Sequence, residues 1–433
     1  MTYVKEKGSP ILGVILFLVF TLHFGVFEQS PQNPIGIKFM QEVYLAVCLG
    51  FTVLFLAGSV GGKKPQYDIG LAYCLYAAFM FTFLVAVFGK MFYGQPLAYG
   101  LIEERRVLMC FSFFILLWLG ERMPSWQFER TLLMVSLLAI VLSWLCYYEL
   151  LPDLRDDDGN RDLSRPGRSA VGTLALVFGY CLCLYFWHKG KSPLDGTPRK
   201  HRLLYLVFGL ACVMTIVFVT QTRQVLVLCA IFTVLCLRGK TLKLAAVACV
   251  LLMPLMIWPH MLDFMGVNLD FYIHSIQTGG TDEIRQNTID QIFTHLNSNY
   301  WVPSGSLSLM WNEGFRNYFS YFFFLSDVGV FGTLFRFGAL AFVVIPLSFF
   351  VYYIVAKRLN RSLDFVLPIF LAHLAIWPLQ GMFEYLQGMT ALLLATQALK
   401  THYQRNVPRT LPQEPLDTDL LYRRNYQAPS YYS

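Results

Sequence analysis

The stretch IGLAYCLYAAFMFTFLVAVF, from Ile69 to Phe88, contains no charged residue. A helix needs about 20 apolar residues to cross the ~30 Å hydrocarbon core of a bilayer, so this stretch predicts a transmembrane helix. The whole chain has the same character, since 56% of its 433 residues are hydrophobic, 14% are charged and the mean hydropathy is +0.51. This composition is typical of a polytopic membrane protein.

Apolar runs of this kind recur along the chain and predict an all-α fold with about twelve transmembrane helices. They are Ile11 to Phe27, Val43 to Val60, Ile69 to Phe88, Val107 to Leu119, Thr131 to Leu150, Ala170 to Trp187, Leu203 to Val219, Val225 to Leu237, Leu244 to Trp258, Phe331 to Val355, Phe365 to Leu379 and Met382 to Leu399. The fourth run is short, so we expect its helix to begin near Pro96. That helix carries the segment Glu103-Glu104-Arg105-Arg106 into the bilayer, where its charges are expected to pair with one another.

Basic residues are unevenly distributed between the connecting segments. With the N-terminus inside the cell, the cytoplasmic segments hold 22 Lys and Arg against 9 Asp and Glu, and the remainder holds 12 against 18. An excess of basic residues is typical of cytoplasmic loops. The pattern therefore predicts a multi-pass protein with both termini in the cytoplasm. It also explains the net charge of +7 without nucleic acid as a partner.

One long polar segment, residues 261–330, interrupts the apolar pattern and is expected on the outer face. It contains its own amphipathic helix, because Thr281 followed by two acids predicts an N-cap and apolar residues recur at helical spacing after it. The apolar residues are Ile284, Ile289, Ile292, Phe293 and Leu296. Arg285 lies on the same face, where it either binds an anion or reaches a neighbouring acid or water. We expect residues 1–400 to form one transmembrane domain that includes this segment, and 401–433 to be a disordered cytoplasmic tail.

The step Thr220-Gln221-Thr222-Arg223 lies between the seventh and eighth runs. The eighth run ends before Arg238, and about 21 Å of helix separates the two arginines, so Arg223 is expected beneath the outer surface of the bilayer. A charge at that depth costs at least about 2.5 kcal/mol and needs an anion, unless the helix tilts or breaks so that the side chain reaches water.

Arginines and aromatic residues gather on the predicted outer face. The arginines are Arg168, Arg223, Arg285, Arg316 and Arg336. Planar guanidinium groups match phosphate oxygens, and several can share one diphosphate. Tyr300 and Trp301 offer flat rings that suit sugar faces or the membrane interface. Ser304-Gly305-Ser306 predicts a flexible point between these groups.

The sequence contains no Ser-His-Asp order, no His/Cys metal spacing and no glycine-rich phosphate loop. We therefore expect no metal and no other cofactor. A lipid diphosphate is a leaving group that departs once its charge is stabilised. The ten cysteines all fall inside apolar runs and are predicted to be small apolar side chains rather than a disulfide framework.

Several features together resemble the bacterial O-antigen polymerase and ligase superfamily. They are the twelve runs, the large outer segment, the Thr-Gln-Thr-Arg step, the segment from Arg165 to Gly172, and Asn317 followed by Gly329-Val330-Phe331-Gly332. The resemblance implies a C-type glycosyltransferase-like helical fold in the bacterial inner membrane. It implies transfer of glycans from undecaprenyl diphosphate to an acceptor hydroxyl in the periplasm. The implied partners are undecaprenyl-diphosphate-linked oligosaccharide and membrane lipid, with a flippase and a chain-length regulator as further partners.

The resemblance, for Arg223 and Arg285, and the residue types, for the others, suggest roles for individual residues. Arg223 and Arg285 would grip the diphosphate, and Arg316 would orient donor or acceptor. The expected substrate-binding residues are Arg168, Arg336, Tyr300, Trp301 and Asn317. The candidate bases are His295, Glu313 and Asp327.

One departure from the family pattern separates its two activities. The ligases carry a His-Asn pair before the Gly-x-x-Gly, whereas this chain has Arg316-Asn317. The difference favours a polymerase that joins lipid-linked repeat units into an exopolysaccharide, capsule or O-antigen chain. A ligase acting on lipid A core and a transporter of lipid-linked sugar are the alternatives.

Overall fold

The computed structural model describes residues 8–28, 35–37, 39–58, 64–151, 168–237, 280–320, 323, 325, 328–377 and 387–406. Within these ranges the regular structure is helical, apart from two isolated bridges. Four helices in these ranges are long and apolar enough to cross a membrane: Pro65–Tyr93, Ser125–Tyr147, Arg202–Thr220 and Val330–Leu359. The predicted all-α class is confirmed, and these helices suit a membrane protein.

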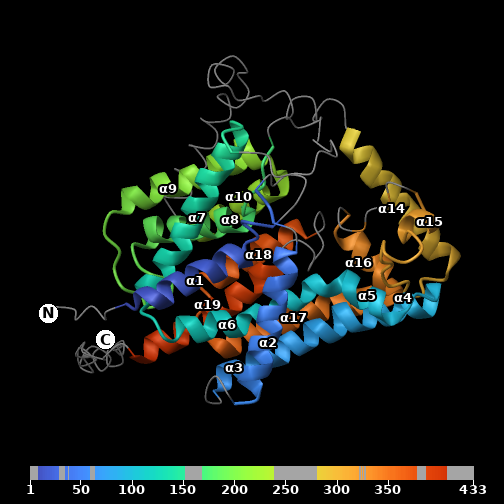
Figure 1. The fold of residues 1–433 in the computed structure, drawn as a ribbon, viewed down its shortest axis with the longest axis horizontal. Helices are drawn as coiled ribbons and strands as arrows, with labels where there is room; N and C mark the ends of the chain where they lie inside the picture. The colour runs from blue at the N-terminus through green and yellow to red at the C-terminus, as the bar shows by residue number, and fades with distance from the viewer. Residues whose placement is uncertain are drawn as a thin grey trace, which may run out of the picture.

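The helices follow the apolar pattern closely (Figure 1). They are α1 (Pro10–His23), α2 (Met40–Leu56), α3 (Pro65–Ala77), the π-helix η1 (Ala78–Leu84), α4 (Val85–Tyr93), α5 (Leu97–Glu103), the 3₁₀ helix η2 (Glu104–Phe111), α6 (Ser112–Gly120), α7 (Ser125–Tyr147), α8 (Thr173–Lys189), α9 (Arg202–Thr215), the π-helix η3 (Ile216–Thr220), α10 (Arg223–Cys236), α14 (Gly280–Ser298), α15 (Phe315–Tyr318), α16 (Val330–Phe337), η5 (Gly338–Leu340), α17 (Ala341–Leu359), α18 (Val366–Ile376) and α19 (Gln387–Asn406). Each predicted run contains a helix except Leu244 to Trp258, which lies outside the described residues. As expected, α5 begins directly after Pro96.

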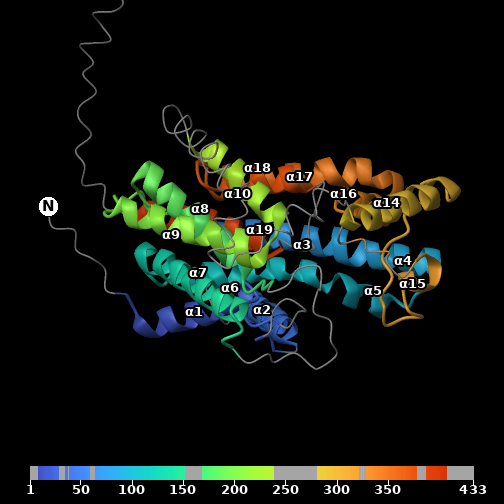
Figure 2. The same cartoon turned by 90° about the horizontal axis from the view of Figure 1, so that it is seen from above.

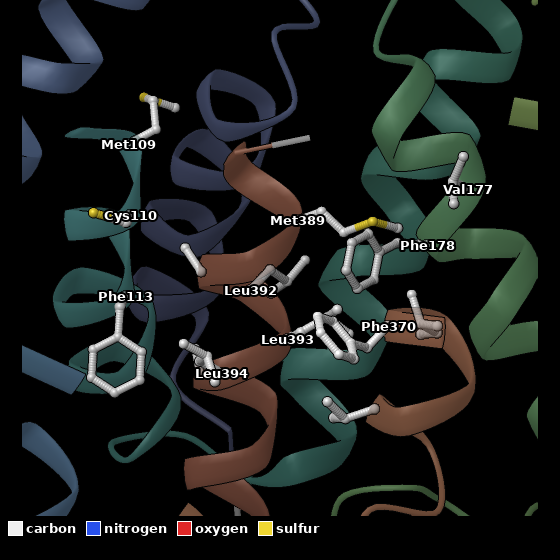
Figure 3. Packing of buried hydrophobic residues seen from close by; sticks show 14 of the residues in the cluster. Met109, Cys110, Phe113, Val177, Phe178, Phe370, Met389, Leu392, Leu393 and Leu394 are labelled. Carbon is white, nitrogen blue, oxygen red and sulfur yellow. The ribbon is translucent and has the colours of Figure 1, made fainter. Parts of the chain in front are cut away.

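Helix α19 lies at the centre of the bundle. Every residue from Gly388 to Lys400 is buried. Figure 3 shows α19 between two groups of helices, with Met389 and Leu393 directed toward Phe178 and Phe370. Each face of α19 therefore packs against protein, and its buried polar side chains are hydrogen-bonded: Gln397 donates to the carbonyls of Asn360 and Ser362, and Lys400 binds Asp364.

The C-terminal end of α19 corrects the predicted boundary of the tail. The helix continues to Asn406, so residues 401–406 are helical rather than disordered. The reason is that Tyr403 is buried and bonded at the end of α6. Its hydroxyl donates to the carbonyl of Gly120, the last residue of α6 (2.6 Å), and is also 3.0 Å from the carbonyl of Met123. These bonds satisfy carbonyls at a helix end and tie α19 to α6. Residues 407–433 of the predicted tail lie outside the described residues.

The ion pairs of the described ranges join segments that the sequence places on the same side. On the predicted outer side they are Arg105 with Glu42 (2.7 Å), Arg106 with Glu28 (3.8 Å) and Arg336 with Glu104 (3.0 Å). On the predicted inner side they are Lys64 with Glu121 (2.7 Å), Arg199 with Glu129, and Lys400 with Asp364. Pairs of the first kind also correct the expectation that the Glu103-Arg106 segment pairs with itself. The partners of this segment are Glu42 on α2, Arg336 on α16 and Glu28, which follows α1. Adjacent residues of a helix point in different directions, so they reach different segments.

The helices of the predicted inner and outer sides lie toward different ends of the molecule. Helix α1 begins and α19 ends at one end, whereas α14, α15 and α16 lie toward the other (Figure 1). The long helical stretch from α3 through α4 connects the two. The predicted outer segment is therefore gathered opposite the predicted cytoplasmic ends.

Candidate functional site

The Thr-Gln-Thr-Arg step is a sharp reversal between two helices. Helix α9 passes into the π-helix η3, which ends at Thr220. Gln221 adopts the left-handed conformation (φ 49°), its N–H donates to the carbonyl of Ile216 (2.9 Å), and α10 begins at Arg223. The helix is therefore broken within two residues at this step. The N–H groups of Val225 and Leu226 donate to the carbonyl of Thr222 (3.2 and 3.3 Å), and the N-terminal end of a helix favours an anion.

The segment before α8 is bound to this reversal. The Arg168 Nε donates to the carbonyl of Thr220 (3.1 Å), and the Ser169 N–H donates to the carbonyl of Val219 (3.2 Å). Arg168 therefore lies beside the turn that precedes Arg223. For Arg223 itself, the structure describes the backbone. Of the predicted arginines, these two are brought together by the fold.

Two buried polar atoms at the reversal have no hydrogen-bond partner among the described residues. They are the Oγ of Ser169 and the Oε1 of Gln221, on residues that are 2% and 5% exposed. A buried polar atom left without a partner costs about 1–3 kcal/mol, so such atoms are uncommon in folded proteins. A polar ligand at this turn would supply the missing bonds.

Sequence reasoning missed two further polar residues, which lie on α18. Phe365 at the start of α18 contacts Phe232 in the second half of α10 (6.4 Å between ring centroids). The two helices pack closely, and α10 ends four residues after Phe232, so we infer that α18 runs back along α10 in the antiparallel direction. Arg223 lies nine residues before Phe232 on α10, and Leu374 lies nine residues after Phe365 on α18, so Arg223 and Leu374 are at the same level. His373 is therefore at the level of Arg223 along the helix pair.

His373 and Trp377 are buried, and both carry a ring nitrogen without a partner among the described residues. The two residues are one helical turn apart, so they share a face of α18. His373 is flanked on that face by buried Ile369, Phe370 and Ile376, which directs it into the bundle. The signal in the sequence was a His and a Trp four residues apart within the run Phe365 to Leu379.

A second group of predicted residues lies around the loop 301–308, which passes between α4 and α16. The buried amide of Gln95 holds this loop at two points, donating from Nε2 to the carbonyl of Ser306 (3.1 Å) and accepting from the N–H of Ser308 at Oε1 (2.8 Å). The N–H of Gly305 donates to the carbonyl of Arg336 (3.0 Å). Ser304 and Ser306 are fully buried or nearly so. The prediction that Ser304-Gly305-Ser306 is flexible is therefore wrong, because hydrogen bonds fix this segment between α4 and α16.

Gly305→Ala is expected to destabilise the protein by roughly 1–3 kcal/mol, because the loop has no room for a methyl group. Gly305 has φ +69°, and a Cβ there would lie 2.2 Å from the N of Gly89 and 2.4 Å from the O of Val85. Unfolding of the detergent-solubilised protein measures the effect. Gly196→Ala is the matched control, since Gly196 has φ +76° with open space around it. Equal losses in the two variants would mean that backbone strain, and not the close approach of α4, sets the cost.

His295, the first candidate base, ties α14 to this loop. Its Nε2 is 2.9 Å from the Oγ of Ser304, and its Nδ1 is 3.3 Å from the Nδ2 of Asn299. The rings of Phe92, Phe319 and Phe335 surround it at 5.0–5.2 Å. Both ring nitrogens are thus engaged in holding the loop, and burial lowers the pKa of His295 below its ordinary value of 6.5.

The lowered pKa predicts that stability falls in mild acid. Below about pH 6.5 the unfolded chain takes up a proton at His295 that the folded chain does not, so the free energy of unfolding decreases until the folded pKa is reached. His295→Gln, which keeps a donor but cannot become charged, is expected to have a weaker pH dependence. Melting temperatures of both proteins between pH 5 and pH 8 provide the comparison. Parallel curves for the two proteins would contradict the prediction, since all other histidines are the same in both.

The remaining predicted residues are placed as follows. Two of them are half-buried: Arg285 on α14, and Trp301. The exposed ones are Tyr300, Glu313 (φ 58°), and Arg316 and Asn317 on α15. Arg336 forms an ion pair with Glu104. Asp327 lies outside the described residues. In both Figure 1 and Figure 2, α14 and α15 stand apart from α8, α9 and α10. The predicted residues therefore form two groups, one at the start of α10 and one around the 301–308 loop.

The start of α10 is the better candidate for a ligand site. It combines Arg168, the first residues of a helix and buried polar atoms that find no partner within the described ranges. The second group is held by hydrogen bonds and an ion pair of its own. Comparison with known proteins adds nothing to this choice, since no protein-family model and no curated protein matches the chain.

Proposed function

We propose that this protein is a polymerase that joins undecaprenyl-diphosphate-linked oligosaccharide repeat units into an exopolysaccharide, capsule or O-antigen chain. The observation that carries the proposal is a set of buried polar atoms near the start of α10, next to Arg168, that have no hydrogen-bond partner among the described residues. The Oγ of Ser169 and the Nε2 of His373 can donate to a phosphate, and the Oε1 of Gln221 can accept from a sugar hydroxyl. Such a site suits a large polar anion that arrives from the membrane. A diphosphate headgroup has that chemistry, and it fits the arginines and the helix N-terminus together.

The reaction needs little beyond charge stabilisation. The acceptor hydroxyl attacks C1 of the donor sugar, a new glycosidic C–O bond forms, and the bond between C1 and the diphosphate oxygen breaks. Undecaprenyl diphosphate leaves with the electron pair, and the hydroxyl proton passes to a base or to water. Arg168, Arg223 and the positive end of the α10 dipole would stabilise the negative charge that develops on the leaving group. We assign Arg285 and Arg316 to orienting the glycan, since they lie in the second group.

The proposed location is the bacterial inner membrane, with about twelve spans, both termini in the cytoplasm and the site on the periplasmic side. The four long apolar helices support a membrane protein. The ion pairs support the division of the connecting segments between two sides, because each described pair joins segments on one predicted side. The excess of basic residues in the predicted cytoplasmic segments supports the orientation. A flippase that delivers the substrate and a chain-length regulator are the expected protein partners.

The test is an assay of the purified protein in liposomes with an undecaprenyl-diphosphate-linked oligosaccharide, without nucleotide or metal. Longer lipid-linked glycans are the expected product. Transfer only to added lipid A core would make the protein a ligase. Movement of the lipid-linked sugar across the bilayer with no new glycosidic bond would make it a transporter.

A further inference from the structure

Residues 300–302, here called the Tyr300 tip, form an exposed apolar projection after α14. Tyr300 is 91% exposed, and Val302 beside it is also exposed. The tip lies next to η5 and the first turn of α17, where Leu340, Phe342 and Val343 are exposed as well. These side chains carry no charge, and together they continue the apolar surface of the helix Val330–Leu359, which is long enough to cross a membrane.

Backbone contacts fix the tip against α17. The Ala339 N–H donates to the carbonyl of Trp301 (2.9 Å). Gly338 has φ +53°, and a Cβ there would lie 2.1 Å from the same carbonyl oxygen, so the two segments touch directly. The ring of Trp301 is 6.0 Å from that of Phe342, between centroids. The tip and the start of α17 therefore behave as one surface.

The backbone is strained at the two residues that present these rings. Tyr300 and Trp301 both adopt left-handed backbone angles, φ 53° and 58°, which are unfavourable for residues with bulky side chains. The strained pair is held by hydrogen bonds from the Trp301 N–H to Leu296 (2.8 Å) and from the Val302 N–H to Asn299 (3.0 Å). Strain that the surroundings enforce is commonly found where a side chain has a function.

The exposed face of α14 has a different character. Gln286, Asn287 and Asp290 are exposed there, and Gln286 is hydrogen-bonded to Asp290 (2.9 Å). This face suits water, whereas the Tyr300 tip presents aromatic and aliphatic groups. The described part of the outer segment thus has a polar face on α14 and an apolar edge at the Tyr300 tip, and this edge adjoins α17.

We propose that the Tyr300 tip is a membrane anchor that rests in the headgroup region of the outer leaflet, with phospholipid as its occupant. Tyr and Trp suit this region because each has an apolar ring and a polar group that remains hydrated or bonded. The indole N–H of Trp301 already has such a partner in Asn297 (3.1 Å). The anchor holds α14 to α16 at a fixed height above the bilayer. It replaces the sugar-binding role expected for Tyr300 and Trp301, and it does not depend on the proposed polymerase activity.

The test uses a bimane fluorophore on Tyr300→Cys in the full-length protein, reconstituted in phosphatidylcholine vesicles with or without lipids brominated near the headgroup. Asn287→Cys on the polar face of α14 is the aqueous control, and Phe342→Cys on α17 is the lipid-facing control. The nine described native cysteines are free and mostly buried, so labelled wild-type protein gives the background. We expect brominated lipid to quench the label at positions 300 and 342 and to leave the label at position 287 bright.

Other results would overturn the anchor. A label at position 300 that resists quenching, as at position 287, would place the tip in water. A label that is unquenched by brominated lipid but changes emission when undecaprenyl-diphosphate-linked oligosaccharide is added would restore the sugar-binding role. An unquenched label at position 342 would show that this face of α17 is not in lipid, and the continuous surface on which the anchor depends would be lost.

Discussion

Arg223→Ala is expected to lower the rate of glycan polymerisation by about 10²- to 10³-fold, the loss typical when one preorganised group that stabilises a leaving charge is removed. Arg223 is the first residue of α10, directly after the left-handed Gln221, and the turn is bound by Arg168. The rate of chain extension by purified protein in liposomes is the measurement. Arg223→Lys is expected to recover little activity, because lysine keeps the charge but not the planar fork.

Two variants separate a role in the site from a general effect of losing an arginine. Arg202→Ala is the matched control, because Arg202 is exposed and is also the first residue of a helix, α9, but lies on the predicted inner side. It should polymerise normally. Arg168→Ala should reduce the rate as Arg223→Ala does. Normal chain extension by Arg223→Ala, in protein that is inserted and folded, would remove the start of α10 from the proposed site.

The sequence predicted the parts of the fold that depend on local patterns. Apolar runs located the helices, and the stripe through Ile292 and Leu296 located α14, where both residues are fully buried. Helix formation and amphipathicity repeat over a few residues, so they can be read without knowing what lies opposite. The start of α5 after Pro96 was predictable for the same reason.

Contacts between distant segments were not predictable in this way. Ser304-Gly305-Ser306 has the composition of a flexible linker, yet it is fixed by Gln95, which lies more than 200 residues earlier in the chain. Likewise, the Glu103-Arg106 segment contains opposite charges in sequence, but its charges are bound by other helices. Local composition shows which groups need partners, and only the packing of the helices determines which partners they find.

The candidate site shows the same division. The Thr-Gln-Thr-Arg step and Arg168 were identified from the sequence, because charges next to apolar runs are conspicuous. His373 was overlooked because a single histidine in an apolar run resembles a core residue. Its position at the level of Arg223 follows from the antiparallel packing of α10 and α18, which no local pattern encodes.

Arg336→Ala is expected to destabilise the protein by about 3–5 kcal/mol, since it removes an ion-pair partner of a buried carboxylate. The Nε of Arg336 donates to Glu104 (3.0 Å), and the two side chains are 14% and 8% exposed. Reversible unfolding in mixed micelles measures the loss. Arg105→Ala is the control, because its pair with Glu42 is 35% and 39% exposed and such pairs contribute at most about 1 kcal/mol.

The double variant Glu104→Gln/Arg336→Met tests whether Arg336 also binds substrate. Replacing both members of a buried pair by neutral groups of similar size removes the unpaired charge, so much of the lost stability should return. If Arg336 only holds α16 against η2, the double variant should also polymerise glycan. A stable but inactive double variant would support the predicted substrate-binding role. Stability of Arg336→Ala within about 0.5 kcal/mol of the wild type, the range of ordinary surface substitutions, would mean that the pair with Glu104 does not hold these helices together.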